Sequence, residues 1–467
     1  MSERSVIADY LIMGAGAAGM AFADSVFTET DATIAIVDRR DRPGGHWNDA
    51  YPFVRLHQPA SGYGVNSVQL GSGAIDQVGL NAGFNELAAG TEVLSHFDTI
   101  IRHKFLPSGR VQYFSMSELG DDRVVTSLLS GERRDVKARR FVDAAYSQVH
   151  IPSTSPPAYA ISRESKCVPL NDLPRVAPGY DDFVVVGAGK TGMDACIWLL
   201  QNGVDPARIR WIVPRDSWIL NRANVQPGDE FFAALCKSLA DQAEAAALAD
   251  CVDDVFARLE ASGEFLRLDP NVEPQAYHCA TLSEREVAEL RRIKDVIRLG
   301  RVLAINADTV MLERGTIATG PSTLHIDCSA SGLPNRPAVD VFNGDRITLQ
   351  CLRTCQPTFS SALTGFVEST FTDDAVKNRI CAPIELPSTP LDWLRMFQVE
   401  LANRKCWSKY PEIDNWLASS RLDMFIRTAR SRLGVDLEAT EHLGRYLTYV
   451  NQASDNIEKL LTEQLAV

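Results

Sequence analysis

Two glycine-rich turns constrain this chain more than any other feature of its sequence. The first follows the apolar residues 7–13 and reads Gly14-Ala-Gly16-Ala-Ala-Gly19, with an alanine-rich amphipathic stretch behind it. A strand that feeds such a turn, followed by a helix, is typical of a dinucleotide-binding unit. Gly14 would make the tight turn, Gly16 would let the backbone approach a pyrophosphate, and Gly19 would let helix and strand pack closely. The first N–H groups of the helix would then face the phosphates.

The strand predicted next in the chain ends in an acid. Residues 33–37 are followed by Asp38, which lies 19 residues beyond Gly19. A carboxylate at the end of the second strand of such a unit binds the ribose hydroxyls of the nucleotide. The alternative is a glycine turn used only for packing, with Asp38 as a solvated acid. Because strand, turn, helix, strand and acid occur in this order, the sequence favours the nucleotide site.

The second turn repeats the pattern near residue 187. The apolar residues 183–186 lead into Gly187-Ala-Gly189-Lys190-Thr191-Gly192, and another amphipathic stretch follows. Two such units predict an α/β fold with two Rossmann-like dinucleotide-binding domains, and therefore two nucleotides.

The second strand of this later unit ends differently from that of the first. Residues 209–213 lead to Arg215, where the first unit has an acid. A guanidinium pairs with the 2′-phosphate of NADPH, whereas a carboxylate would repel it. Asp216 follows immediately and favours NADH instead. The alternatives are therefore NADPH held by Arg215, NADH held by Asp216, or Arg215 as a solvated surface residue.

A segment behind Asp38 carries a resemblance to a known family. It contains Gly44-Gly45-His46-Trp47 and then Tyr51-Pro-Phe-Val-Arg55. This combination resembles the class B flavoprotein monooxygenases and the wider group of two-dinucleotide flavoproteins. Residues 142–146 and 326–332 are similar to the short crossings at which such chains pass between their nucleotide domains.

The resemblance implies FAD at the first turn and NADPH at the second. It implies a monooxygenase that forms a C4a-hydroperoxyflavin and oxygenates N, S or a carbonyl of a small metabolite, with O₂ as co-substrate. The candidate catalytic residues are polar side chains of the flavin-adjacent segment, namely Arg55, His57, Gln58 and Asn66. The expected cofactor-binding residues are Gly14, Gly16, Ala17, Ala18, Gly19, Asp38, Arg39, Gly45, His46, Trp47, His57, Gly187, Gly189, Lys190, Thr191, Gly192, Arg215, Ser331 and Gly332.

One family feature is missing. Members usually carry a Phe-x-Gly-x-x-x-His fingerprint before the second glycine turn, but residues 158–169 contain neither that Gly nor that His. An NAD(P)H-dependent flavin dehydrogenase or oxidase that transfers no oxygen to a substrate therefore stays open. A redox-silent flavin-binding protein is the third alternative.

The domain organisation expected from these patterns is discontinuous. Residues 1–150 and 320–385 would form the FAD-binding domain, with a helical excursion near 82–105. Residues 178–320 would form the NAD(P)H-binding domain, with a mainly helical insertion at 223–294. Strand patterns return at 302–305 and 309–312, and residues 386–467 read as a C-terminal helical segment.

Composition narrows the compartment and the partners. The formal charge of −13 disfavours nucleic acid and anionic membranes as partners. The sequence contains no apolar run of spanning length and no signal-like start, so we expect a cytoplasmic protein; a homodimer stays open.

Most of the ten cysteines, Cys351 and Cys355 included, are expected to be reduced structural thiols. No Cys-x-x-Cys occurs, which argues against a zinc site and against a disulfide reductase, and we expect no metal.

Overall fold

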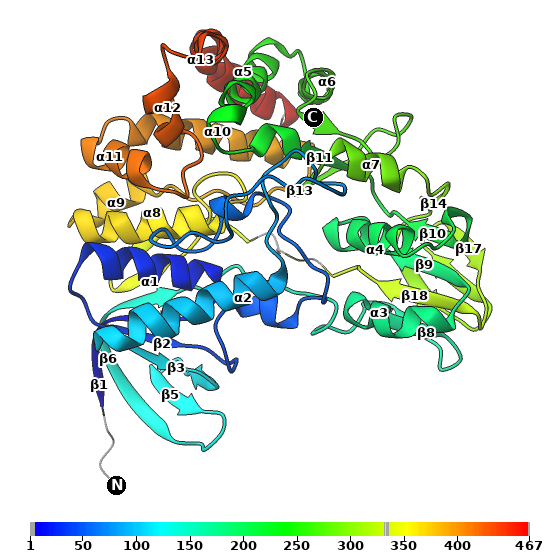
Figure 1. Cartoon of the computed structure of the whole chain (residues 1–467), viewed down its shortest axis with the longest axis horizontal. Coiled ribbons are helices and arrows are strands. Elements are labelled where there is room, and N and C mark those ends of the chain that lie inside the picture. The colour runs from blue at the N-terminus through cyan, green and yellow to red at the C-terminus, as the bar shows by residue number, and fades with distance from the viewer. Residues whose placement is uncertain (1–4, 331, 333–335, 466–467) are drawn as a thin grey trace.

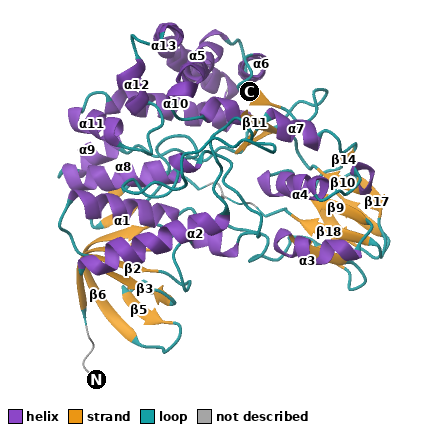
Figure 2. Ribbon diagram, viewed as in Figure 1, coloured by secondary structure: helices purple, strands orange, loops and turns teal. Residues whose placement is uncertain are grey.

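A computed structural model describes residues 5–330, 332 and 336–465. Its strands gather into separate sheets, and its longest helices cluster away from the two largest of them (Figures 1 and 2). Both large sheets are built mainly from parallel strands, which confirms the predicted α/β fold with two Rossmann-like units. No helix of these described residues is long and apolar enough to cross a membrane.

In the first sheet, the strand that leads into the first glycine turn lies in the interior, between two parallel neighbours. Its main path in spatial order is β19 (Phe342–Asn343), β20 (Arg346–Thr348), β6 (Arg133–Asp143), β1 (Val6–Met13), β2 (Ile34–Val37) and β3 (Val111–Phe114). All neighbours are parallel except β19 and β20, and a small antiparallel pair, β4 (Ser117–Leu119) and β5 (Val124–Ser127), extends from β6. Helix α1 (Ala17–Glu29) connects β1 to β2, as the pattern predicts.

Helices cover this sheet on the side of α1. Helix α8 (Pro357–Thr370) packs against α1, where Ser25 Oγ donates a hydrogen bond of 2.8 Å to the carbonyl of Ala362. Close contact between the helices requires a small residue, because a Cβ on Gly365 would lie 2.9 Å from the carbonyl oxygen of Phe22. Helix α2 (Gly90–Thr99) and a π-helical turn (Ile100–Phe105) lie within the excursion predicted near 82–105.

The second sheet repeats the plan around the second turn. Its strands in spatial order are β14 (Asp295–Ile297), β10 (Ile209–Ile212), β9 (Asp182–Val186), β18 (Thr323–Asp327) and β8 (Lys166–Pro169), all parallel. Helix α4 (Lys190–Gln201) connects β9 to β10. β9 is almost continuously buried, as expected for a parallel strand covered on both faces. A second, smaller sheet contains β7 (Ala160–Ile161), β15 (Val302–Ile305), β16 (Thr309–Leu312) and β17 (Gly315–Ala318), which confirms the strands predicted at 302–305 and 309–312.

The stretch 223–294 is less helical than the sequence indicates. It contains α5 (Phe232–Leu248), α6 (Val252–Ala261) and α7 (Glu284–Leu290), but also β12 (Phe265–Leu266) and β13 (Ala276–Leu282). Both strands pair with β11 (Ser217–Asn221) in a three-stranded sheet. The segment 276–282 is too short to show the alternation of apolar and polar residues that indicates a strand. Its pairing with β11 makes it one.

Helices dominate the end of the chain, as predicted for residues 386–467. They are α10 (Pro390–Trp407), α11 (Pro411–Ser419), α12 (Ile426–Arg432) and α13 (Leu437–Leu465), and α9 (Asp374–Ile380) precedes them. α13 lies along α5 of the inserted stretch, so the end of the chain covers the insertion (Figure 1).

Candidate functional site

The first glycine turn leaves the sheet at the end of β1. Gly14 has a φ of +104°, a left-handed conformation that favours glycine. A Cβ on Gly19 would lie 2.0 Å from the carbonyl oxygen of Gly14, so this glycine lets α1 pack against the strand end. The second turn has the same geometry: Gly187 has a φ of +124°, and a Cβ on Gly192 would lie 2.1 Å from the carbonyl oxygen of Gly187.

The middle glycine of each turn is different, because nothing inside the protein requires it. Gly16 and Gly189 have ordinary extended backbone, with φ of −74° and −76°. A Cβ on Gly16 would meet no protein atom closer than 3.6 Å, and one on Gly189 would meet none within 4 Å among the residues described. Neither α1 nor α4 has a side-chain cap at these residues. A Cβ would therefore face open space at Gly189 and make ordinary van der Waals contact with Gly45 at Gly16. A glycine without a packing role beside uncapped helix N–H groups is the arrangement that accommodates a phosphate.

Asp38 lies directly beside the first turn. Its carboxylate accepts the backbone N–H groups of Ala15 at 2.7 Å and of Arg40 at 2.8 Å, one on each oxygen, and the residue is buried. Each oxygen retains a second lone pair for a ligand hydroxyl. The neighbouring Arg39 side chain is exposed and lies 3.7 Å from Glu118.

The Gly-Gly-His-Trp segment packs on the same turn. The N–H of Gly44 donates to the carbonyl of Ala15 at 2.8 Å, and a Cβ on Gly45 would lie 3.0 Å from the Cα of Gly16. His46 stacks on Trp47 with ring centroids 5.4 Å apart, and burial lowers the pKa of His46 to about 4. Ala17 and Ala18 form the first turn of α1 and are partly buried.

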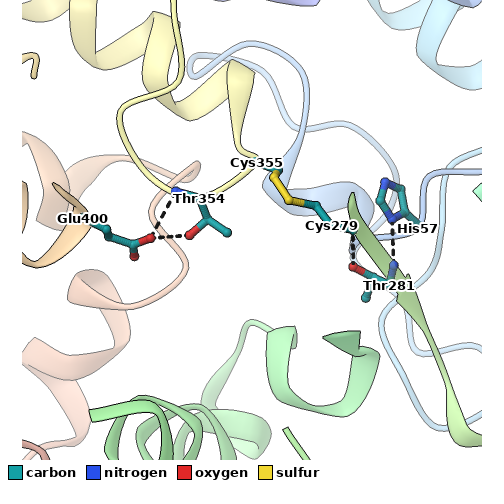
Figure 3. The surroundings of a disulfide bond; sticks show 6 residues. All are labelled: His57, Cys279, Thr281, Thr354, Cys355 and Glu400. Atoms are coloured by element: carbon teal, nitrogen blue, oxygen red, sulfur yellow. Dashed lines mark hydrogen bonds between the residues drawn. A yellow bond between two sulfur atoms is a disulfide. The ribbon is translucent and has the colours of Figure 1, made fainter. Parts of the chain in front are cut away.

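His57 is the predicted catalytic candidate with the most defined environment. Its Nδ1 accepts the backbone N–H of Thr281 in β13 at 3.2 Å, so the ring proton resides on Nε2 (Figure 3). Burial lowers the pKa of His57 to about 3, helped by the charges of Lys190 and Arg222. The Nε2–H has no hydrogen-bond partner among the described residues. His57 is therefore a neutral, oriented donor.

Arg222 and Glu286 complete this cluster. The Arg222 side chain is 1% exposed, donates to the carbonyls of His57 and Thr281 at 3.2 Å each, and lies 2.6 Å from the carboxylate of Glu286. Sequence reasoning missed both residues. Glu286 carries a local signal, since Ser283-x-x-Glu286 forms the capping box of α7, but nothing local indicates its ion pair with Arg222, 64 residues away.

A second set of contacts joins the segment 51–58 to α4, the helix that follows the second turn. Lys190, the first residue of α4, forms an ion pair with Asp194, and the hydroxyl of Tyr51 donates to the same carboxylate at 2.5 Å. Burial and the Asp194 carboxylate raise the pKa of Tyr51 well above its ordinary value. Phe53 stacks on Trp198 of α4 at 5.5 Å. The segment 51–58 therefore contacts both α4 and the inserted strand β13.

The other predicted residues are placed as follows. Arg55 is exposed and donates to the carbonyl of Leu87 at 3.4 Å, and Asn66 accepts a hydrogen bond of 2.8 Å from Ser420. Gln58 and Thr191 are partly buried. Gly332 is exposed and accepts the N–H of His150, while Ser331 lies outside the described residues.

Arg215 is exposed and makes no ion pair or hydrogen bond within the described chain. Asp216, its competitor, is buried and bound to Arg298. Of these two neighbours, only Asp216 is paired with another side chain of the described residues.

One expectation about cysteine is wrong. Cys279 of β13 and Cys355 are joined by a disulfide, with Cα atoms 6.4 Å apart, although Cys355 was expected to be a reduced thiol. The remaining eight cysteines are free. Thr354, beside Cys355, donates its N–H and its hydroxyl to Glu400 (Figure 3). Cysteines 76 residues apart give no pairing signal, and only the approach of β13 to the loop before α8 brings them together.

A surface hollow of about 390 Å³ lies elsewhere, beside α2. Leu70, Gly71, Glu92 and His96 contribute to its lining, and neither glycine turn does. His96 is already engaged there, since its Nε2 accepts the N–H of Val65 at 3.3 Å. The glycine turns and the His57 cluster are therefore the better candidate site.

Comparison with known proteins gives relatives of this chain and structures of similar shape. No family model matches. Among solved structures, a cyclohexanone monooxygenase in its closed form has 13% identity and a TM-score of 0.47, covering 97% of this chain and 98% of its own. A steroid monooxygenase bound to NADP has 14% identity and a TM-score of 0.46, covering 98% of each chain. A bacillithiol disulfide reductase from Bacillus cereus has 12% identity and a TM-score of 0.41, covering 74% of this chain and 90% of its own. Likenesses of this size carry no functional conclusion.

The sequence relatives are much more similar. The uncharacterized protein Rv2000 of Mycobacterium tuberculosis is 47% identical over 423 residues, which cover 90% of this chain and 78% of the relative. The uncharacterized protein Mb2023 of Mycobacterium bovis matches with the same identity and the same coverage. Identity at this level over nearly the whole chain places it, with its two glycine turns, in the family of these mycobacterial proteins.

Proposed function

We propose that this protein is a flavin-dependent oxidoreductase that holds FAD at the first glycine turn and NADPH at the second. The observation that carries the proposal is the pair Gly16 and Gly189. Each is a glycine that neither backbone conformation nor packing demands, at a helix N-terminus without a side-chain cap. Glycines that the protein itself does not require, at two corresponding positions, fit the close approach of two pyrophosphates.

The residues around each turn fit these groups. FAD would be held by the turn 14–19, by Asp38 through its free lone pairs and by the segment 44–47. NADPH would be held by the turn 187–192 and by Arg215. The corresponding domains would be 1–150 with 320–385, and 178–320, with 386–467 as the C-terminal helical segment. When bound, FAD would take a hydride from NADPH and pass the electrons on to O₂.

The chain itself would supply orientation and an uncharged hydrogen-bond donor. His57 offers its Nε2–H to a ligand while the ring stays neutral at physiological pH. The backbone N–H of Thr281 orients the ring, and Arg222, paired with Glu286, holds the backbone carbonyl of His57. The low pKa keeps the ring neutral, and the N–H of a neutral imidazole is a far weaker acid than an imidazolium, so it donates a hydrogen bond without transferring its proton. Such a donor suits the stabilisation of a negatively charged oxygen group.

Within this class we propose a monooxygenase acting on N, S or a carbonyl of a small metabolite. An NAD(P)H oxidase or dehydrogenase is the second candidate, and the segment before the second turn favours it. Residues 158–169 lack the Gly and His of the fingerprint that the resembled family usually carries before its second turn. Part of this region, 166–169, forms the edge strand β8 and pairs with β18. Product analysis with ¹⁸O₂ separates the two, since only a monooxygenase places labelled oxygen in an organic product.

The cofactor assignment has a direct test in Gly16→Ala and Gly189→Ala. Each added Cβ fits the protein, so both variants should fold with unchanged thermal stability in the absence of cofactor. Gly16→Ala should lose bound FAD, seen as loss of the yellow flavin spectrum. Gly189→Ala should retain FAD and bind NADP⁺ at least about ten-fold more weakly. Gly179→Ala is the control, because its Cβ also meets no protein atom within 4 Å. Full FAD retention in Gly16→Ala would contradict the first assignment.

A further inference from the structure

The sheet around the second turn brings two short segments together at one edge. β10 and β14 are parallel neighbours, with Ile212 opposite Ile297, and the N–H of Val213 donates to the carbonyl of Ile297 at 2.9 Å. Arg215 and Asp216 follow β10, and Arg298 follows β14, so all three leave the sheet side by side. In a Rossmann-like unit this edge lies next to the adenine ribose of the bound nucleotide.

Arg298 and Asp216 form a two-pronged ion pair at this edge. Nε of Arg298 lies 2.8 Å from one carboxylate oxygen of Asp216, and Nη2 lies 3.0 Å from the other. Such a fork-to-carboxylate pair is among the strongest arrangements of two charged side chains. Asp216 is buried and Arg298 partly buried, so solvent screens their interaction only in part.

This pair changes what Asp216 is able to do. A free acid at the end of the second strand accepts the 2′-hydroxyl of NADH and repels the 2′-phosphate of NADPH. Both oxygens of Asp216 are instead engaged by Arg298, and its negative charge is balanced. Arg215, one residue earlier, is exposed and has no partner among the described residues, so its guanidinium is available to a phosphate.

The remaining charges around Arg298 do not reverse this balance. Asp269 lies 3.4 Å from Arg298 but is one-third exposed, and Arg314 donates to the backbone carbonyl of Arg298 at 2.8 Å. Asp216 is therefore the nearer and the more buried of the two carboxylates that Arg298 contacts.

We propose that Arg298 is a specificity-determining residue that makes the second nucleotide site select NADPH by neutralising Asp216. The proposal rests on the proposed function. It assigns the selectivity to Asp216 and Arg298 together. The sequence pattern identifies only Asp216, which follows the second strand of the unit. Arg215 would contact the 2′-phosphate, and Arg298 would act through Asp216.

Two nucleotide fragments isolate the 2′-phosphate. Adenosine 2′,5′-bisphosphate carries it and 5′-AMP lacks it, and isothermal titration of FAD-saturated protein gives the affinity for each without any turnover. Saturation with FAD prevents 5′-AMP from entering the first nucleotide site. The wild-type protein should bind the bisphosphate more tightly. Arg298→Ala should reduce the ratio of the two affinities by ten- to a hundred-fold, since the freed carboxylate repels the 2′-phosphate and accepts the hydroxyl.

The double variant Arg298→Ala with Asp216→Asn should recover most of the wild-type ratio, because it removes the released charge. Arg175→Ala serves as control, since Arg175 pairs with Asp172 at the surface, in the segment that follows β8 at the opposite edge of the second sheet. A purely structural ion pair would lower thermal stability in Arg298→Ala and leave the ratio unchanged, which would overturn the inference alone. A wild-type protein that binds neither fragment would contradict the second nucleotide site, and the inference with it.

Discussion

The backbone N–H of Thr281 donates a hydrogen bond of 3.2 Å to Nδ1 of His57, across a separation of 224 residues. This contact determines the tautomer of a histidine that lies in the segment behind the first glycine turn, although its donor belongs to a strand inserted in the second unit (Figure 3). Cys279, two residues before Thr281, is tied to Cys355, so the strand that orients His57 is itself covalently anchored.

The low pKa of His57 predicts a pH dependence of stability. Its folded pKa, about 3, lies below the ordinary value of 6.5, so the unfolded chain binds the proton first as pH falls. The stabilising contribution is complete above pH 6.5 and declines below it. Between pH 7 and pH 5, the free energy of unfolding should therefore fall by up to about 2 kcal/mol more in wild type than in His57→Gln. Urea titrations at both pH values measure this. The exposed His103→Gln should match wild type, and a His57→Gln variant that also matched it would refute the assignment.

The buried pair Arg222–Glu286 predicts a strongly non-additive pair of substitutions. Arg222→Met leaves Glu286 as an unpaired carboxylate in a buried position, and should lower the free energy of unfolding by about 3–5 kcal/mol. Adding Glu286→Gln removes that charge and should recover much of the loss. Arg258→Met, which breaks the exposed pair with Asp254, should cost less than about 1 kcal/mol. Additive effects at 222 and 286 in chemical denaturation would argue against the pairing.

The disulfide predicts both a count and a stability change. Alkylation of the unfolded, non-reduced protein should modify eight of its ten cysteines, as intact mass spectrometry would record. Cys355→Ser opens a loop spanning 76 residues and should lower the free energy of unfolding by about 4 kcal/mol under oxidising conditions. Cys251→Ser, at an exposed free thiol, is the matched control. Ten modified cysteines would show that the bond does not form.

Glu264 predicts a pH dependence of the opposite sign. Its side chain is buried, accepts hydrogen bonds from Gln242 at 2.8 Å and Asn224 at 2.9 Å, and burial raises its pKa from 4.5 to about 7. The stabilising contribution is complete below pH 4.5 and is lost as pH rises through 7.

Glu264→Gln removes this titration, so its stability relative to wild type should increase by about 2 kcal/mol between pH 5 and pH 8. Thermal unfolding followed by circular dichroism at the two pH values is a sufficient measurement. The exposed Glu230→Gln should show no such trend. If Glu264→Gln were equally destabilised at both pH values, burial would not be raising the pKa of this carboxyl group.

Local sequence determined the two glycine turns of this protein. The roles of Gly14, Gly19, Gly187 and Gly192 depend on atoms only a few residues away, so the order of strand, turn and helix was sufficient to predict them. Asp38 belongs to the same local unit, and its place beside the first turn follows from one strand, one helix and the next strand.

Tertiary structure decided everything that depends on the approach of distant segments. His57 meets Thr281, Arg222 meets Glu286 and Cys279 meets Cys355 only after the inserted stretch has packed against distant parts of the chain. Asp216 meets Arg298 only after β14 has paired with β10. Side chains separated by 64 to 224 residues leave no periodicity or spacing in the sequence, because their contact is a property of how the sheets pack. The choice of Arg215 or Asp216 is the sharpest case. The two residues are adjacent in sequence. Arg298, directly after the neighbouring strand β14, pairs with Asp216 and not with Arg215.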